Sequence, residues 1–209
     1  MNGSKYEGEW VDDLQDGQGK ETWKDGSVYE GLYHQGHKHG EGRYIWADGS
    51  MYEGEWLNNK IHGKGKYAWS DGRVYLGSWV ENKMHGYGQL AWPDGRQYEG
   101  EFFNDVKQGQ GTFQWPDGRI YTGQWLNGKQ HGTGVLTAAQ EGGTGVPTMG
   151  YWEKGKLLRE LTKDDIEFLE QQQIYGQEEE EAEDEDEEDD DEEAEEVAAA
   201  QEGEQVLLQ

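Results

Sequence analysis

The sequence contains no cysteine, only three prolines and no long apolar run. Without thiols the chain can form neither a disulfide framework nor a thiolate metal site, which fits a reducing cytoplasm. A membrane-spanning helix needs about 20 consecutive apolar residues, and no stretch approaches that length. The opening MNGSKYEGEW has no apolar segment of the kind found in signal peptides. We therefore expect a soluble, intracellular protein.

Basic residues are also scarce, because 18 Lys and Arg stand against 45 Asp and Glu, for a net charge of −27. Most of the excess lies near the C-terminus, where residues 157–209 hold 24 acidic and 2 basic residues. Nucleic-acid binding is disfavoured, since it requires a basic face. The run Glu178–Glu196 repels itself, and we expect either a plain solvated tail or an interaction tail there.

Glycine and aromatic residues are abundant instead, with 33 Gly, 10 Trp and 12 Tyr in 209 residues, while only 32% of the chain is hydrophobic. They recur with a period of 23 residues, which indicates a repeat architecture. Each unit contains Tyr-x-Gly-x-aromatic and then Gly-x-Gly, and five units close with Trp-x-Asp-Gly. The units begin at Tyr6, Tyr29, Tyr52, Tyr75, Tyr98 and Tyr121.

Within a unit the residue types alternate with a period of two. In the third unit, Tyr52, Gly54 and Trp56 alternate with Glu53 and Glu55. Such alternation between turn signals predicts half-buried antiparallel strands. Each unit is therefore predicted to be a β-hairpin, and Asp-Gly turns join successive hairpins into an all-β antiparallel meander.

Loop lengths follow from keeping the motif residues on one face. Between hairpins, a three-residue loop, Ser70–Gly72, with its glycine left-handed, pairs Tyr67 with Tyr75. Within the third unit, a four-residue loop over 58–61 is predicted. That loop gives four opposed pairs: Leu57 with His62, Trp56 with Gly63, Gly54 with Gly65, and Tyr52 with Tyr67.

This register explains why strands contain glycine. A glycine has no Cβ, so a ring on the neighbouring strand can lie across its bare backbone. The entropy cost of glycine is then offset by aromatic cover, and paired glycines let the sheet curl. We assign this structural role to Gly54, Gly63, Gly65, Gly77, Gly86 and Gly88.

The unit YEGEW…HGKGKYAW…DG resembles the MORN repeat, over residues 6 to about 136, with a degraded seventh copy at 149–152. Departures are mild: Glu21 and Leu90 replace an aromatic residue of the second strand, and the insertion TAAQEGGTGVPT precedes the last strand. The resemblance implies an elongated, single-layer, twisted sheet with an aromatic groove. It does not by itself fix a function.

Three segments are predicted: a repeat array at 1–156, a capping-helix segment at 157–177 and an acidic low-complexity tail at 178–209. Repeat arrays need their ends closed. The first strand, Lys5–Val11, has no preceding strand, so we expect an open edge suited to pairing with a second copy or a paralogue.

A helix is predicted over 163–175. Thr162 is its expected N-cap with Asp165 at N3, Leu161 and Ile166 form a staple, and Gly176 ends the helix. We expect Ile166, Phe168 and Leu169 to pack the helix against the last strands. The helix serves either as a cap or as a docking element for a partner.

Catalytic chemistry is not indicated. His39, His62, His85 and His131 recur, but equivalent positions lie two strands apart, about 9.6 Å, too far to share a metal ion. No helix follows any Gly-x-Gly, which excludes a dinucleotide fingerprint. Glutamates such as Glu53 lie beside lysines on an exposed face, which gives no reason for a raised pKa. We expect no enzyme activity, metal or cofactor.

The aromatic face is the candidate binding surface, because a single layer has no second sheet to cover it. We predict a groove that holds a helix or extended segment of a partner protein. Its predicted residues are Tyr29, Tyr52, Trp56, Tyr67, Trp69, Tyr75, Trp79, Trp92, Tyr98, Trp115, Tyr121 and Trp125.

A short array followed by an acidic tail is similar to the radial spoke head MORN subunits of the ciliary axoneme. That similarity implies a structural scaffold in the cytoskeleton of a cilium or flagellum, with other spoke or cytoskeletal subunits as partners. Two alternatives stay open: phosphoinositide-dependent membrane association, and an adaptor that recruits an enzyme. Membrane lipid is not expected, since lysines such as Lys64 are interleaved with glutamates.

Overall fold

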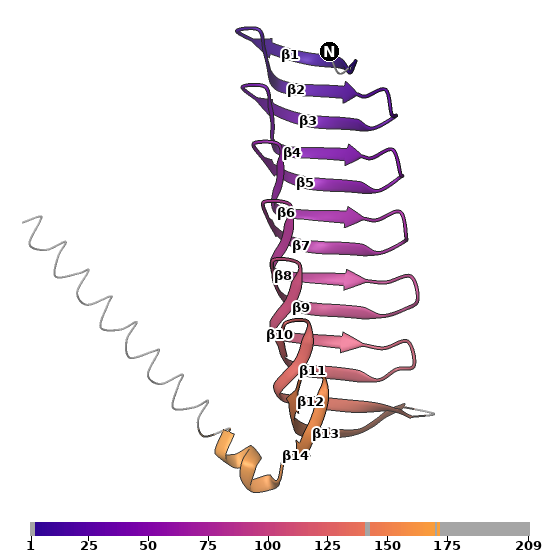
Figure 1. The fold of residues 1–209 in the computed structure, drawn as a ribbon, viewed down its shortest axis with the longest axis vertical. Helices are drawn as coiled ribbons and strands as arrows, with labels where there is room; N and C mark the ends of the chain where they lie inside the picture. The colour runs from indigo at the N-terminus through magenta and orange to yellow at the C-terminus, as the bar shows by residue number, and fades with distance from the viewer. Residues whose placement is uncertain (1–2, 141–142, 170, 172–209) are drawn as a thin grey trace, which may run out of the picture. The chain divides into compact units, whose positions relative to one another are not determined.

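The computed structural model describes residues 3–140, 143–169 and 171. The chain divides into the repeat array, which ends at Glu160, and a second unit that begins at Leu161. The array is one 14-stranded antiparallel sheet in which each strand pairs with its neighbours in sequence order. Figure 1 shows these strands side by side from β1 to β14. The predicted all-β meander is therefore confirmed.

The strands come in pairs that match the repeat units. They are β1 Lys5–Val11, β2 Leu14–Thr22, β3 Val28–His34, β4 His37–Ile45, β5 Met51–Leu57, β6 Lys60–Ala68, β7 Val74–Val80, β8 Lys83–Ala91, β9 Gln97–Phe103, β10 Val106–Gln114, β11 Ile120–Leu126, β12 Lys129–Gln140, β13 Gly143–Glu153 and β14 Lys156–Glu160.

The turn between hairpins follows the prediction. Trp69 N donates to the Arg73 carbonyl at 2.9 Å, so three residues form the loop. Gly72 has a φ of 91°, and Tyr67 lies opposite Tyr75. A left-handed glycine in this place closes a three-residue hairpin loop.

The turn within a hairpin differs from the predicted four-residue loop. Leu57 pairs with Lys60 and not with His62, so Asn58 and Asn59 alone form the loop. Both asparagines have positive φ, 49° and 67°. Two left-handed central residues make the turn whose twist matches that of paired strands, and asparagine tolerates this conformation.

A β-bulge absorbs the difference in loop length. Trp56 lies opposite Ile61, so the predicted Trp56–Gly63 pair within the hairpin is wrong. Gly63 instead faces Trp79 of the next repeat, and it lies with a φ of 60° in the middle of the bulge, where residues 62–64 lie opposite Glu55 alone, two residues more than a regular ladder has. Beyond the bulge the predicted register holds, because Gly54 faces Gly65.

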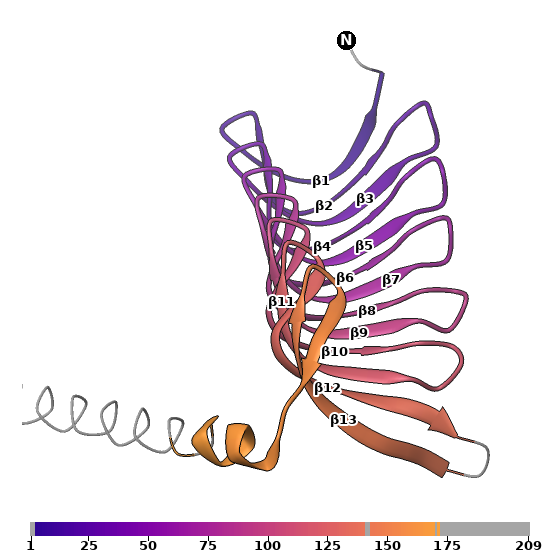
Figure 2. The ribbon, with the colours of Figure 1, turned by 60° about the horizontal axis from the view of Figure 1, so that its bottom comes forward.

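The bulges bend each strand so that the aromatic face lies inside a trough. Lys107 and Phe113 lie near opposite ends of β10, which an extended strand would hold about 20 Å apart. Yet Lys107 Nζ lies 4.5 Å from the centroid of the Phe113 ring. Figure 2 shows the strands of the array curving so that the turns at both ends rise on the same side. The concave face is therefore the aromatic one.

The seventh repeat is more complete than its sequence suggested. The insertion lengthens β12 and β13, and residues 141–142 lie outside the described residues. The strand β14 pairs with β13, so the array runs to Glu160 and passes the predicted boundary at 156. Sequence reasoning missed β14 because Lys156–Glu160 contains neither an aromatic residue nor glycine.

A helix begins at residue 163 in the second unit and is described to 169 and at 171. Its predicted capping box is confirmed: Asp165 N donates to Thr162 Oγ1 at 3.2 Å, and Thr162 N donates to Asp165 Oδ2 at 2.9 Å. The packing of Ile166, Phe168 and Leu169 against the last strands stays a prediction. The predicted end at Gly176 and the acidic tail at 178–209 lie outside the described residues.

Candidate partner-binding surface

In each of the first six hairpins, the pair of glycines that face each other lies beneath a tyrosine of the same hairpin. Tyr52 Oη donates to the carbonyl of Glu55 at 3.0 Å, which draws the ring back over its own strand. The ring then covers Gly65, where an added Cβ would overlap the tyrosine side chain. Gly54 faces the Cα of Gly65 with no room for a Cβ of its own. Tyrosine rings therefore cover bare backbone within a hairpin at four of the six predicted glycines, whereas an added Cβ at the other two, Gly63 and Gly86, would meet the side chains of Glu55 and Ser78.

Tryptophan connects one repeat to the one before it. The indole Nε1 of Trp79 donates to the carbonyl of Gly65 at 3.3 Å. The same bond recurs from Trp56 to Gly42, from Trp125 to Gly111 and from Trp152 to Gly134, at 3.0, 3.0 and 3.3 Å. Each of these four repeats is therefore fixed to its predecessor by a buried ring and a backbone hydrogen bond.

Eight of the twelve predicted groove residues belong to this internal packing and are at most 6% exposed. They are Tyr29, Tyr52, Trp56, Tyr75, Trp79, Tyr98, Tyr121 and Trp125. Burial raises the pKa of the Tyr75 and Tyr121 phenols to about 12. These rings form the core of a single-layer sheet, so a partner meets other residues first.

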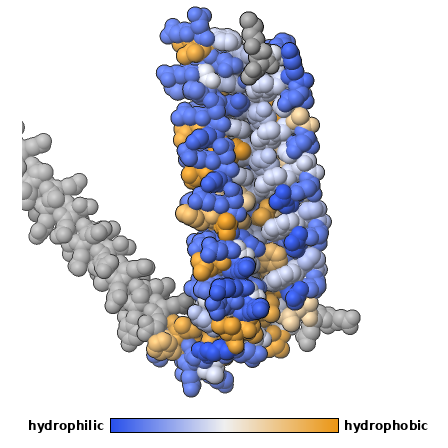
Figure 3. Space-filling model, viewed as in Figure 1, coloured by the Kyte–Doolittle hydropathy of each residue, from blue (hydrophilic) through white to orange (hydrophobic). Residues whose placement is uncertain are grey.

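The other four predicted groove residues keep exposed area and join a row that we call the aromatic ladder. The ladder consists of Trp23, Tyr44, Trp46, Tyr67, Trp69, Trp92, Phe113 and Trp115; Phe113 is buried and the others are half-buried. Ring centroids lie 5.3 Å apart for Trp23 and Tyr44, and 5.0 Å apart for Trp46 and Tyr67. Leu90 interrupts the row between Trp69 and Trp92. Figure 3 shows a column of intermediate hydropathy along the array between hydrophilic side chains.

Arginine residues cover the ends of the ladder tryptophans in three consecutive turns. The Arg73 guanidinium lies 4.9 Å above the Trp69 ring and its Nε donates to Asp71 Oδ2 at 2.8 Å. The Arg73 backbone N–H bonded to Asp71 holds the pKa of that carboxyl below its usual value. Arg96 and Arg119 repeat the arrangement. These charged groups are paired and stabilise turns.

Sequence reasoning missed two lysines on the aromatic face. Lys107 Nζ lies 4.3 Å from the centroid of Trp125 and 5.2 Å from that of Tyr98. Burial, and to a smaller extent the charge of Arg96, lowers the pKa of the Lys107 ammonium to about 8. Lys38 lies 5.0 Å from the Trp23 ring in the corresponding place. Their common signal is a lysine two residues before Gly-x-Gly; sequence reasoning assigned this position to no face because the predicted four-residue loop included it, whereas in the structure it belongs to the strand.

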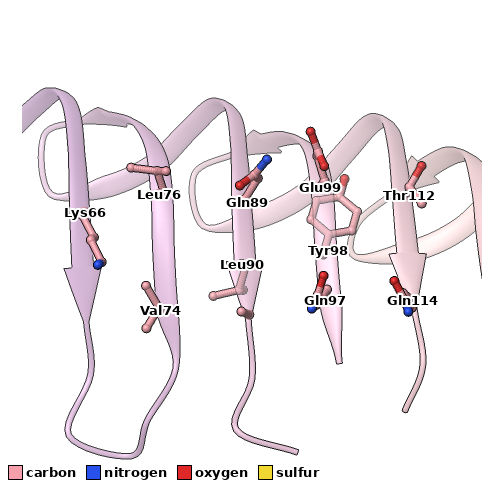
Figure 4. A pocket seen from close by; sticks show the side chains of 11 residues that line it. Lys66, Val74, Leu76, Gln89, Leu90, Gln97, Tyr98, Glu99, Thr112 and Gln114 are labelled. Carbon is pink, nitrogen blue, oxygen red and sulfur yellow. The ribbon is translucent and has the colours of Figure 1, made fainter. Parts of the chain in front are cut away.

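The opposite face carries a hollow of about 410 Å³ over β6 to β10, shown in Figure 4. Leu76 lies in it, where four of the six units have glutamate. Val74 and Ala91 add apolar lining, and Lys66 and Glu99 add opposite charges. Glu99 accepts a hydrogen bond of 2.9 Å from Tyr87 Oη. The sequence signal for this hollow was the missing glutamate at Leu76.

Within residues 3–140, 143–169 and 171, no three His, Asp or Glu side chains are grouped so as to hold a metal ion. No helix in the described part of the chain is long and apolar enough to cross a bilayer. The aromatic face can contribute stacking, apolar contact and cation–π interactions.

The family model for the MORN repeat matches residues 6–28, 29–51, 52–72, 75–95, 98–118 and 121–140. The chain therefore belongs to the MORN-repeat family. This is a non-enzymatic repeat family, and its repeats are characteristic of scaffolds that bind proteins or membranes.

No curated protein matches the chain. Among solved structures, the chain is similar to the TCP domain of Drosophila melanogaster SAS-4, which was solved in complex with a proline-rich motif of Ana2. The two chains are 14% identical and superpose with a TM-score of 0.40, and the match covers 77% of this chain and 90% of that chain. The TCP10c domain of Drosophila melanogaster Sas-4 is 13% identical with a TM-score of 0.38, covering 72% and 99%. The TCP10 domain of Danio rerio CPAP is 17% identical with a TM-score of 0.20, covering 77% and 96%.

Proposed function

We propose that this chain is a non-enzymatic scaffold subunit of a ciliary or cytoskeletal assembly, specifically a component of the radial spoke head in the axoneme. Its partners are other protein subunits of that assembly. The observation that carries the proposal is the aromatic ladder, which places half-buried rings along the concave side of a rigid array. The short array followed by an acidic run supports the spoke head assignment by its similarity to spoke head MORN subunits.

The ladder suits a partner segment because its remaining apolar area is already ordered. Trp46 stacks on Tyr67, and Tyr67 lies 4.5 Å from Trp69. Rings fixed by intrachain contacts lose little entropy when a partner covers them. Aromatic anchors of this kind dominate protein interfaces.

The open edge of β1 is the second proposed contact. Trp10 is 56% exposed, whereas the residues at the same position in later repeats are 3–6% exposed. Those residues cover a Gly-x-Gly of the preceding strand, so a strand that covers Trp10 should also carry Gly-x-Gly. The other edge of this array, β14, contains no glycine. We therefore favour a paralogous repeat protein over a head-to-tail copy at this edge.

Affinity capture with the full chain tests the proposal. Wild-type bait in extracts of ciliated cells should enrich spoke head proteins, and extracts of non-ciliated cells should not yield them. The Trp46→Ala/Trp69→Ala bait should lose at least tenfold of the enrichment, while Leu126→Ala, on the opposite face, should lose none. If the Trp46→Ala/Trp69→Ala bait captured these proteins as well as the Leu126→Ala bait does, the ladder would be excluded as the binding surface.

Liposome sedimentation distinguishes the scaffold proposal from the alternative of phosphoinositide-dependent membrane association. The chain should remain in the supernatant with vesicles that contain phosphoinositide at physiological salt, because its acidic excess opposes anionic lipid. Tight sedimentation under these conditions, together with failed capture, would overturn the scaffold proposal in favour of membrane association.

A further inference from the structure

Lys107 occupies a position where packing does not require a lysine. Its ammonium lies between 4.3 and 5.2 Å from three ring centroids on the concave face. The same position holds Ile61 in the third repeat and Met84 in the fourth. Apolar side chains therefore fit this place, and the lysine adds a half-buried charge that packing alone does not explain.

The second repeat shows how the array compensates such a lysine internally. Lys38 lies over the Trp23 and Tyr29 rings, and the charge of Glu21 acts on it. The Glu21 carboxylate is held in place by Tyr33, whose Oη donates to Glu21 Oε2 at 3.0 Å. Glu21 raises the pKa of Lys38 against the larger, lowering effect of burial. Lysine, carboxylate and phenol thus act as one set.

The fifth repeat keeps the lysine of this set and lacks its partners. The residues three repeats after Glu21, Tyr33 and Lys38 are Leu90, Phe102 and Lys107. In the described part of the chain no carboxylate forms a direct ion pair with either lysine, but the charge that acts on Lys38 is the negative one of Glu21, whereas the charge that acts on Lys107 is the positive one of Arg96. Lys107 is a cation whose internal counter-ion is missing.

A cavity gives access to this cation. Its volume is about 190 Å³, and its lining includes Lys107, Lys129, Phe113, Trp115 and Trp125. The remaining lining residues, Gly128, Gln130 and Gly155, bring no acidic group. Phe113 and Trp115 belong to the aromatic ladder, so the cavity is continuous with the proposed partner surface.

We propose that the Lys107 cavity is a carboxylate subsite, which receives an aspartate or glutamate side chain of the protein segment bound along the aromatic ladder. The inference rests on the proposed scaffold function and specifies the chemistry of the partner. A carboxylate between aromatic walls restores the charge arrangement that Glu21 gives Lys38. A low-dielectric wall strengthens such an ion pair, and its hydrogen bonds to the ammonium offset its desolvation.

A polypeptide carboxylate suits the site better than a lipid phosphate. The cavity offers one half-buried ammonium and the exposed Lys129, whereas lipid headgroup binding relies on clusters of basic residues. The internal counterpart at Lys38 is itself a carboxylate. Phosphate binding is therefore an outcome that would contradict the proposal.

The test uses the full chain and a carboxylate probe, N-acetyl-glutamate N-methylamide, with the glutamine analogue and inorganic phosphate as controls. Side-chain NMR follows the Lys107 ammonium and the indole N–H groups of Trp115 and Trp125. The carboxylate probe should shift these signals and raise the apparent pKa of Lys107, and the glutamine analogue should not. Lys107→Met, which copies the residue at Met84, should abolish the shifts while leaving the circular dichroism spectrum unchanged.

Two exchanges between repeats sharpen the test. Leu90→Glu/Phe102→Tyr rebuilds the internal set and should weaken probe binding at least tenfold. Glu21→Leu removes the internal carboxylate and should create a second binding site at Lys38. Equal probe binding to wild type and Lys107→Met, or a shift with phosphate or phosphoinositide vesicles alone, would overturn the proposal.

Captured partners distinguish this inference from the proposed function. A spoke protein that binds Lys107→Met as well as wild type leaves the scaffold function intact and removes the carboxylate subsite. The opposite result is also possible: the probe binds at Lys107, but the ladder variants capture partners as well as wild type does. That result would support the carboxylate subsite and refute the aromatic ladder as the partner-binding surface.

Discussion

The indole Nε1 of Trp56 donates a 3.0 Å hydrogen bond to the carbonyl of Gly42, which lies in the preceding repeat. The Trp56 ring also contacts Tyr29 of that repeat, with centroids 5.4 Å apart. A sheet of one layer has no opposing layer to form a core, so its cooperativity depends on such contacts between neighbours. Trp56 is therefore a connection between two units as well as part of the core.

Trp56→Ala should destabilise the array by about 3–5 kcal/mol, because it removes a buried ring and leaves the Gly42 carbonyl unpaired. Trp56→Phe should cost less, about 1–2 kcal/mol, since it loses the indole hydrogen bond and part of the ring volume but keeps a buried ring, as Phe102 provides at the equivalent position. Denaturant unfolding measures both. Trp10→Ala is the control, and its cost should stay below about 1 kcal/mol because Trp10 is exposed. Equal costs for Trp56→Ala and Trp10→Ala would contradict the coupling role.

Gly65→Ala should lower the free energy of unfolding by about 2–3 kcal/mol, because the new methyl group displaces the Tyr52 ring. Gly49→Ala is the matched control, since Gly49 has a φ of 86° but nothing within 4 Å of an added Cβ. Its cost should be about 1 kcal/mol, from backbone strain alone. Chemical denaturation of both variants checks the difference, and a larger cost at Gly49 would refute steric cover by tyrosine.

Lys107→Met should raise the stability of the array at pH 7 by about 1–3 kcal/mol. The folded-state pKa of Lys107, about 8, lies below the ordinary value of 10.5, so folding disfavours the protonated lysine. This penalty is complete below pH 8 and disappears as the pH rises through 10.5; the attraction of the ring faces offsets part of it. The stabilisation should therefore shrink at high pH.

Unfolding curves at pH 7 and pH 10 measure that change. Lys129→Met serves as the control, because its exposed side chain should contribute little at either pH. A stabilisation of Lys107→Met that does not vary with pH would point to packing rather than charge.

Buried tyrosines should make the array sensitive to alkali. Burial raises the pKa of Tyr75 and Tyr121 to about 12, and it raises the pKa of Tyr29, Tyr52 and Tyr98 as well. A raised folded-state pKa stabilises the fold below the ordinary value of 10, and this stabilisation is lost as the pH rises through the folded value. Phenolate absorbance should therefore appear in two phases, the later one together with loss of the circular dichroism signal. A single phase near pH 10 in a folded array would contradict the burial.

Much of the hairpin register could be predicted from the sequence. Alternation placed Gly54 opposite Gly65, and the Ser70–Gly72 loop placed Tyr67 opposite Tyr75, because side chains change face at every residue of a regular strand. The prediction failed where the strand is irregular. The bulge at Gly63 shifts the pairing register by two residues, and a two-residue asparagine turn replaces the longer loop.

The candidate site was predicted as a face and not residue by residue. Tyr52 and Tyr67 are both motif aromatics, yet the first is fully buried and the second is half-buried. Trp79 of the next repeat lies near both rings, at 5.8 and 5.9 Å, but the hydroxyl of Tyr52 is bonded to the Glu55 carbonyl, which draws this ring down onto Gly65. Spacing within one repeat carries no information on such contacts.

By itself, the sequence determined the period, the antiparallel meander, the membership in the MORN family and the need for glycine beneath the rings. These features are local, since each depends on residue type and on neighbours in the same or the next strand. Only the tertiary structure decided which rings are buried, that β14 extends the array, and that Lys107 lies among three rings without a counter-ion in the described residues. Those outcomes depend on how far each bulge bends its strand, because the bend brings residues from opposite ends of a hairpin together.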